Sequence, residues 1–313
     1  MVASSASLCL EVNILPENPF EAEGKWYKGN VHTHTTNSDG EWPPDQVAAE
    51  YKANGYGFLF ITDHRRVTDV SGLSEDGFLV LNGDEIDAGR TELGHRYHLV
   101  ALNLKEPISE QDAPTVQGII DLARSKGAEV IIGHPYWSGL TINDVIHLEG
   151  YIGIEVFNTT CFVSIAKGHS TVHWDDLLAR GKQVWGFAVD DAHEKFNDHC
   201  PIDVCVAWIM AKLPELTEAE IMLAIKSGRF YSSNGPSIYD ISVRDGKISV
   251  STSEVKVINF IADVSRGESF TALGGGSLTG AEYRVRGSEK YIRVECFDKD
   301  GNAAWSNPIV FNP

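Results

Sequence analysis

Short apolar runs alternate with helix-like segments over the first two thirds of the chain. The runs are rich in Val, Ile, Leu and Phe, as buried strands are, and lie at residues 58–61, 78–81, 99–102, 129–132, 152–157, 184–189 and 204–210. Helices are predicted at residues 45–54, 115–126 and 221–226, and a glycine follows each of them within two residues. This alternation is typical of a parallel α/β domain, and a barrel is the arrangement that we expect.

The pattern changes after about Arg229, where short runs with period-two alternation replace the helix-like segments. Six strands are predicted there, at residues 239–243, 248–252, 255–262, 282–286, 291–297 and 308–311. Turn signals such as Asp245-Gly246 and Asp300-Gly301 separate them, which predicts a small antiparallel β-sandwich. We therefore expect a lead-in segment over 1–28, a barrel over 29–236 and a β-sandwich domain over 237–313.

The composition fits a globular protein with an acidic surface. Hydrophobic residues make up 42% of the 313 residues and charged residues 22%, so long disordered stretches are not expected. The formal net charge is −18, from 26 basic and 44 acidic residues. Such a surface repels phosphate backbones, which argues against a nucleic-acid partner.

Neither the cysteines nor the N-terminus indicates secretion. The five cysteines are an odd number without CxxC spacing, which argues against a disulfide framework or a zinc finger and is compatible with a reducing compartment. No Lys or Arg precedes Lys25, and Glu11 interrupts the first apolar run, so no secretory signal is visible in the sequence as given. No segment is long and apolar enough to span a bilayer, and we expect a cytoplasmic protein without a membrane partner.

Histidines and carboxylates gather where the predicted strands end. All 11 histidines lie between His32 and His199, so residues 200–313 contain none. Five strand ends carry His, Asp or Glu, in the groups His32-Thr-His34 with Asp39, Asp63-His64, Asp84-Glu85, Gly133-His134 and Asp190-Asp191-Ala-His193. In a parallel barrel these ends meet at one face. Their joint occurrence predicts a metal site there.

The spacing within these groups suits metal ligation. Residues i and i+2 of an extended segment point to the same side, so His32 and His34 can share one ion, as can Asp191 and His193. Imidazole and carboxylate ligands suit zinc, manganese or iron. A bridging carboxylate such as that of Glu85 can hold two cations about 3.5–4 Å apart. We therefore expect two or three divalent or trivalent metal ions.

In their order and approximate spacing these motifs resemble those of the PHP (polymerase and histidinol phosphatase) superfamily. They are Gly29-Asn-Val-His-Thr-His34, Ser38-Asp-Gly40, Ile61-Thr-Asp-His64, Gly83-Asp-Glu85, Gly133-His-Pro135 and Asp191-Ala-His193. Arg229-Phe-Tyr-Ser-Ser-Asn-Gly-Pro236, followed by strands, also resembles the CehA/McbA-like branch. The resemblance implies a distorted (β/α)7 PHP-type barrel with a di- or trinuclear site.

The resemblance also implies a ligand set, carried over residue by residue. It comprises His32, His34, Asp39, His64, Glu85, His98, His134, Asp191 and His193. Asp39 stands where several relatives have a histidine, which bears on the identity or affinity of its ion. His95 competes with His98, and we prefer His98 because its spacing to the following apolar run resembles the family better.

Other candidates come from the residues themselves. Arg65 and Arg66 directly follow His64, and one of them could clamp an anionic substrate oxygen; we assign this role to Arg65. For Glu155, an inward position and a contact with a helix are both compatible with the sequence. No Gly-x-Ser-x-Gly elbow is present, and no cysteine has an evident neighbouring base, so a covalent nucleophile is unsupported.

The predicted activity is hydrolysis by metal-activated water. Asp191 or a ligating histidine could donate a proton to the leaving group, whereas a strongly acidic leaving group would need no donor. Small anionic phosphate esters are the preferred substrates, which would make the protein a phosphoric ester hydrolase. Two alternatives stay open. One is hydrolysis of carbamates, esters or amides at the same metal site, and the other is a binding module in which the metals are structural. The nearly complete ligand set favours an enzyme, because a structural site does not need three positions.

Overall fold

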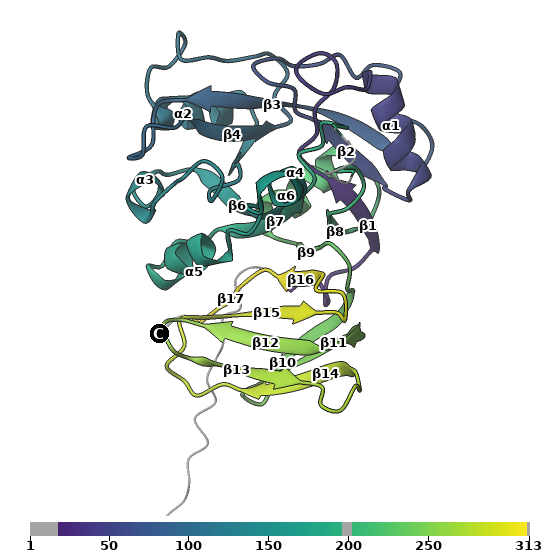
Figure 1. The fold of residues 1–313 in the computed structure, drawn as a ribbon, viewed down its shortest axis with the longest axis vertical. Coiled ribbons are helices and arrows are strands. Elements are labelled where there is room, and N and C mark those ends of the chain that lie inside the picture. Colours follow the sequence, from purple (N-terminus) through teal and green to yellow (C-terminus); the bar gives the residue numbers. More distant parts are fainter. Residues whose placement is uncertain (1–17, 196–201, 312–313) are drawn as a thin grey trace, which may run out of the picture.

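A computed structural model describes residues 18–195 and 202–311, so most of the expected 1–28 lead-in and His199 lie outside the described residues. Seven strands of the first two thirds lie side by side in chain order (Figure 1). They are β1 (Lys25–Asn30), β2 (Phe58–Ile61), β3 (Leu79–Ala88), β4 (Tyr97–Leu102), β5 (Glu129–Ile132), β6 (Tyr151–Asn158) and β7 (Trp185–Val189). The expected runs at 58–61 and 129–132 coincide with β2 and β5, because fully buried strands are continuously apolar.

We expected a parallel sheet, but the observed sheet contains antiparallel pairs as well as parallel ones. Strands β1 to β3 pair in parallel, as do β5 to β7, whereas β4 is antiparallel to both of its neighbours. The 89–96 connection between β3 and β4 contains no helix, so the chain turns straight back, which gives antiparallel pairing. Beyond the ends of β1 and β7, Thr33 and Ala192 form an isolated parallel bridge.

The three predicted helices are present as α1 (Pro44–Ala53), α2 (Val116–Ser125) and α6 (Glu218–Ser227). The Thr115 and Thr217 hydroxyls accept hydrogen bonds from backbone N–H groups three residues ahead, which is why α2 and α6 begin there. The sequence analysis missed α3 (Ile142–Val145), α4 (Thr159–Ile165) and α5 (Thr171–Ala179). Helices α3 and α4 have only four and seven residues, too few to show a helical period. Helix α5 does carry an apolar i, i+3, i+4 pattern at Trp174, Leu177 and Leu178, which the sequence analysis overlooked. No helix of the described residues is long and apolar enough to cross a membrane.

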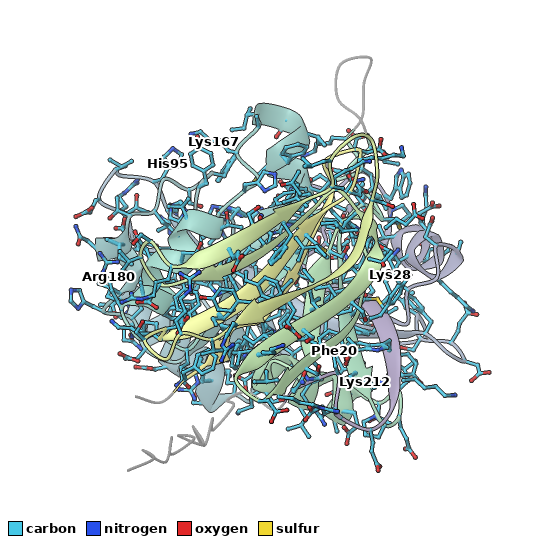
Figure 2. All side chains as sticks on the ribbon, turned by 90° about the horizontal axis from the view of Figure 1, so that it is seen from below. Phe20, Lys28, His95, Lys167, Arg180 and Lys212 are labelled. Atoms are coloured by element: carbon cyan, nitrogen blue, oxygen red, sulfur yellow. The ribbon has the colours of Figure 1, made fainter. Side chains whose placement is uncertain are left out.

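The C-terminal strands form a separate antiparallel sheet and an extension of the large one. The separate sheet contains β10 (Ile238–Arg244), β11 (Lys247–Val255) and β14 (Leu278–Arg284). The extension contains β12 (Val257–Ala262), β13 (Gly267–Thr271), β15 (Tyr291–Phe297), β16 (Ala303–Ser306) and β17 (Ile309–Val310). Side chains from both groups, among them Ile248, Phe260, Tyr283 and Ile292, share one apolar core. These strands lie nearest the viewer in Figure 2.

Strand β9 (Phe230–Ser233) links the two parts of the chain. It pairs with β16 on one side and with β8 (Trp208–Leu213) on the other, and β8 pairs with β1. The sequence analysis predicted no strand for this segment, and it also missed β13 and β16. Four-residue strands such as β9 and β16 carry little alternation of their own, so their pairing partners decide that they are strands.

A buried arginine attaches helix α5 to the C-terminal strands. Arg293 of β15 is only 1% exposed, and its guanidinium donates to both carboxylate oxygens of Asp175 on α5, at 2.8 and 2.7 Å. It also donates to Glu295 at 2.7 Å, and it lies 4.9 Å from the ring centre of Trp174. A charge buried to this extent needs partners to offset its lost hydration. The arginine therefore fixes α5 against β15.

Asp175→Ala should lower the free energy of unfolding by about 3 kcal/mol, because it leaves a buried guanidinium with Glu295 as its remaining carboxylate partner. The matched control is Asp176→Ala on the same helix, whose carboxylate pairs with Arg180 at the surface. That loss should stay within about 0.5 kcal/mol. Urea unfolding of both variants measures the difference, and equal losses would contradict the role of Arg293.

Candidate metal centre

The carboxylate of Glu85 lies at the centre of a cluster of imidazoles. Its side chain is 1% exposed, and each of its two oxygens faces histidine nitrogens. Oε2 lies 3.1 Å from His32 Nε2, 3.0 Å from His34 Nε2 and 3.3 Å from His64 Nδ1, and Oε1 lies 2.7 Å from His98 Nδ1 and 3.0 Å from His134 Nε2. Glu85 stands inside β3 rather than at a strand end, because β3 continues while it pairs with β4. This geometry suits a carboxylate shared between cations.

Asp191 completes one group of ligand atoms. Its Oδ1 lies 3.2 Å from His32 Nε2 and 3.0 Å from His34 Nε2, and with Glu85 these side chains offer four ligand atoms within 4.8 Å of one another. Asp191 has a φ of 54°, in the left-handed region that non-glycine residues rarely adopt. Backbone strain of this kind is often found at functional sites, where the surrounding structure holds a side chain in place.

Asp39 belongs to a second, more open group. It lies with His34, His64 and His193 so that four ligand atoms are again within 4.8 Å of one another. Asp39 Oδ2 is 3.3 Å from His193 Nε2, and Oδ1 is 3.8 Å from His64 Nε2. The Asp39 side chain is 46% exposed, so this end of the cluster opens to solvent.

The structure brings all nine side chains of the expected ligand set to this cluster. A third group of possible ligand atoms combines His64, Glu85 and His98, and His134 joins at Glu85. His98 contacts Glu85 directly, whereas His95 packs against Trp137, with ring centres 6.0 Å apart. Figure 2 labels His95 at the periphery of the molecule. His98 is therefore the better placed of the two.

Buried carboxylates set the protonation of the imidazoles. Burial opposes charging of His34, but hydrogen bonds to Asp191 and Glu85 outweigh it and raise the pKa of His34 to about 10. The pKa of His32 is also raised, because its carboxylate neighbours outweigh its burial. At His64 burial prevails and lowers the pKa. Protons balance part of the carboxylate charge, and binding of metal ions would release them. The nitrogen and oxygen donors fit zinc, manganese or iron.

Glu155 of β6 points inward and contacts two residues of the expected ligand set, so the first of the two positions that the sequence left open for it is the one found. Its Oε1 lies 2.5 Å from His32 Nδ1, and its Oε2 accepts from the backbone N–H of His134 at 2.8 Å. Asn158 Nδ2 donates to Glu155 Oε2 at 2.9 Å and to Asp191 Oδ2 at 3.0 Å. A carboxylate behind a ligating histidine fixes the tautomer and direction of its ring. The signal in the sequence was a single acidic residue within an apolar run.

A cleft opens beside the cluster. Besides members of the expected ligand set, its lining includes Trp137, Thr160, Val163, Ser164, Lys195 and Asp203. Lys195 Nζ lies 3.9 Å from Asp39 Oδ2, and the sequence analysis did not single it out. Arg65, the expected substrate clamp, borders an adjoining hollow, and its guanidinium donates to Asp87. For Arg66 the recorded contact is its backbone N–H, which donates to Asp84 Oδ1 at 3.1 Å.

The fold has a known counterpart. One solved structure covers 97% of this chain and 100% of its own, at 16% sequence identity and a TM-score of 0.50. It is a two-domain protein from Bacteroides vulgatus that contains a predicted PHP-like metal-dependent phosphoesterase. At this identity the likeness establishes the fold: a mixed α/β part with a parallel-rich sheet, together with a separate antiparallel sheet.

Two further solved structures are less similar. A protein from Bifidobacterium adolescentis, assigned as a metal-dependent phosphoesterase, has 17% identity and a TM-score of 0.43 over 57% of this chain and 92% of its own. An amidohydrolase from Chromobacterium violaceum with bound sulfate and no metal has 15% identity and a TM-score of 0.42 over 64% of this chain and 96% of its own. No protein-family model and no curated protein matches the sequence.

Glu155→Gln should weaken binding of the ion nearest His32 about 10- to 100-fold, because a glutamine keeps one acceptor oxygen where Glu155 uses two. Competition with a chromophoric chelator measures the affinity. Glu149→Gln is the control, since Glu149 pairs with Lys182 at the surface just before the same strand. Unchanged affinity in the Glu155 variant would rule out this supporting role.

Proposed function

We propose that the chain is a PHP-type metal-dependent hydrolase that acts on small anionic phosphate esters. The observation that carries the proposal is the convergence of nine His, Asp and Glu side chains around one buried carboxylate, beside a cleft. A structural metal site is closed by its ligands, whereas a catalytic site keeps an open position. The half-exposed Asp39 provides that opening.

Three groups of side chains would hold the ions. His32, His34, Glu85 and Asp191 form the buried group, Asp39, His64 and His193 form the open one, and His98 and His134 flank the second oxygen of Glu85. Zinc, manganese or iron, when bound, lowers the pKa of water and polarises a phosphoryl oxygen. Asp191 is our candidate proton carrier for the reaction. Lys195 and Arg65 would offset the negative charge of the substrate.

We also propose the finer points of architecture. The bridge between Thr33 and Ala192 supports closure of β1 to β7 into a distorted (β/α)7 barrel over 29–236. The core shared by the two C-terminal strand groups supports a β-sandwich over 237–313. The Arg229–Pro236 motif followed by strands supports a place in the CehA/McbA-like branch. A cytoplasmic location remains our expectation.

The wall of the cleft favours a second candidate, namely a carbamate, ester or amide hydrolase on the same metal site. Asp39 and Asp203 face the cleft together with a single lysine, Lys195. A neutral substrate meets less repulsion from these carboxylates than a phosphate dianion does. A panel of p-nitrophenyl phosphate, phosphodiester, carbamate and carboxylate substrates separates the two candidates. Absence of turnover on all of them would favour the binding module.

Asp191→Ala and His64→Ala should each reduce p-nitrophenyl phosphate hydrolysis by more than about 100-fold. Loss of a group that only hydrogen-bonds a metal ligand costs about 10- to 100-fold, and loss of a ligand itself should cost more. Each substitution removes a side chain whose atoms lie in a group of possible ligands.

The wild-type protein, after expression with added metal, should contain at least about two first-row transition ions per chain, measured by elemental analysis.

The control is His147→Ala, because His147 is exposed and lies outside every group of possible ligand atoms among the described residues. Circular dichroism checks that all variants fold. Near wild-type turnover in both site variants at saturating metal would show that the reaction takes place elsewhere. A metal content below about one ion per chain would contradict a multinuclear site.

Lys195→Ala should raise the KM for a phosphomonoester about tenfold, since a hydrogen bond to a charged group contributes about 1.5–3 kcal/mol. The KM for a neutral carbamate should not change. Lys167→Ala is the control, because Lys167 lies over the Tyr136 ring and is not among the residues that line the cleft. Steady-state kinetics provide the values, and equal effects on both substrates would argue against an anion-binding role.

A further inference from the structure

The two ring nitrogens of His64 have different surroundings. Nε2 faces the open group of ligand atoms, 3.8 Å from Asp39 Oδ1. Nδ1 is turned toward β3, and it is buried without a hydrogen-bond partner among the described residues. If Nε2 ligates an ion as a neutral imidazole, Nδ1 carries the proton, and this proton needs an acceptor.

Asp87 offers that acceptor. It lies on β3 two residues after Glu85, so both carboxylates point to the same face of the strand. Asp87 is 8% exposed, and its Oδ1 is buried with no hydrogen-bond partner in the part of the chain that the structure describes. This oxygen lies 3.6 Å from His64 Nδ1 and 4.0 Å from His98 Nδ1. An unpartnered donor and an unpartnered acceptor therefore face each other in the interior.

The alternative acceptor is already in use. Glu85 Oε2 lies 3.3 Å from His64 Nδ1, but the same oxygen lies 3.1 Å from His32 Nε2 and 3.0 Å from His34 Nε2. Glu85 Oε2 is also the oxygen that we expect to bind a cation in the buried group of ligand atoms. Asp87 Oδ1 has no such competing contact within hydrogen-bond distance. A small approach would bring it to the distance of about 3 Å that a hydrogen bond requires.

We propose that Asp87 is a positioning residue of the metal centre. It accepts a hydrogen bond from the Nδ1–H group of His64 and so directs Nε2 toward Asp39 and His193. This inference rests on the metal site of the proposed function. Arg65 donates to Asp87 from the far side, and Arg96 Nε lies 3.8 Å from the same oxygen. The two guanidiniums hold the carboxylate in its orientation. In addition to the role toward the substrate proposed above, Arg65 thus acts on the site through Asp87 and His64.

The test substitutes the carboxylate and measures metal binding rather than turnover. In Asp87→Asn, Arg65 keeps the amide oxygen as its hydrogen-bond acceptor, because a guanidinium can only donate. The amide NH2 then faces His64 Nδ1–H, so two donors oppose each other and no hydrogen bond forms. Metal-free protein is titrated with zinc against a chromophoric chelator. The affinity for one zinc ion should fall about 10- to 100-fold, the range for losing a group that hydrogen-bonds a metal ligand. Asp87→Glu, which keeps the carboxylate, should retain part of the affinity that Asp87→Asn loses.

The matched control is Glu110→Gln. Glu110 accepts from Arg96 at 2.5 Å and from the backbone N–H of Gly89, but faces no imidazole of the cluster. Its substitution should leave all zinc affinities unchanged. Long-range ¹⁵N–¹H NMR of the zinc-loaded wild type should identify Nδ1 as the protonated ring nitrogen of His64, with slower hydrogen exchange than in Asp87→Asn.

The outcomes separate the inference from the proposed function. A wild type that binds no zinc would overturn the metal site itself. A wild type that binds zinc, with equal affinities and equal exchange in Asp87→Asn, would overturn the role of Asp87 alone. Arg65→Ala gives a second variant that should fold, because the Arg65 side chain is 67% exposed. It should weaken the same ion, and unchanged affinity there would likewise count against the inference.

Discussion

Burial of the Glu85 carboxylate among imidazoles is the constraint on which the rest of the site depends. An ionised carboxylate leaves water at high cost unless cations or hydrogen-bond donors surround it. Glu85 has five histidine nitrogens within 3.3 Å of its oxygens. These histidines come from four separate stretches of the chain. The order of β1 to β5 in the sheet brings those stretches to one place.

An outer layer of polar groups supports this centre. Glu155 and Asn158 on β6 contact His32 and Asp191, and the Ser138 hydroxyl lies 3.1 Å from His134 Nδ1. Asp63, in the Thr-Asp-His motif, is turned away from the cluster and accepts from the backbone N–H and the hydroxyl of Thr35. It therefore orders the loop that carries His34 and Asp39. Rings and carboxylates held in this way need little rearrangement when cations bind.

The C-terminal strands contribute to this order although none of their described residues belongs to a group of possible ligands. Asn307, after β16, accepts from the backbone N–H of Gly186 and donates to the carbonyls of Gly228 and Phe230. Gly186 lies on β7, the strand that leads to Asp191. Arg293 fixes α5, and Ser170 just before α5 accepts from the backbone N–H of Tyr136, close to His134. Direct hydrogen bonds and an ion pair therefore connect the C-terminal strands to the segments that carry the cluster.

The sequence by itself determined the local features: the buried runs of β2, β5 and β15, the caps of α2 and α6, and the His, Asp and Glu residues that follow the strands. Hydrophobic period, capping residues and short motifs express these features over a few neighbouring residues. The tertiary structure alone decided the direction of β4, the pairing of β9 with β16, the inward position of Glu155 and the contact of Arg65 with Asp87. Each of these depends on a partner far away in the chain. A residue such as Arg65 can be placed only when the strand carrying its counter-charge has been placed, because charge and hydrogen-bond pairing are satisfied in three dimensions rather than along the sequence.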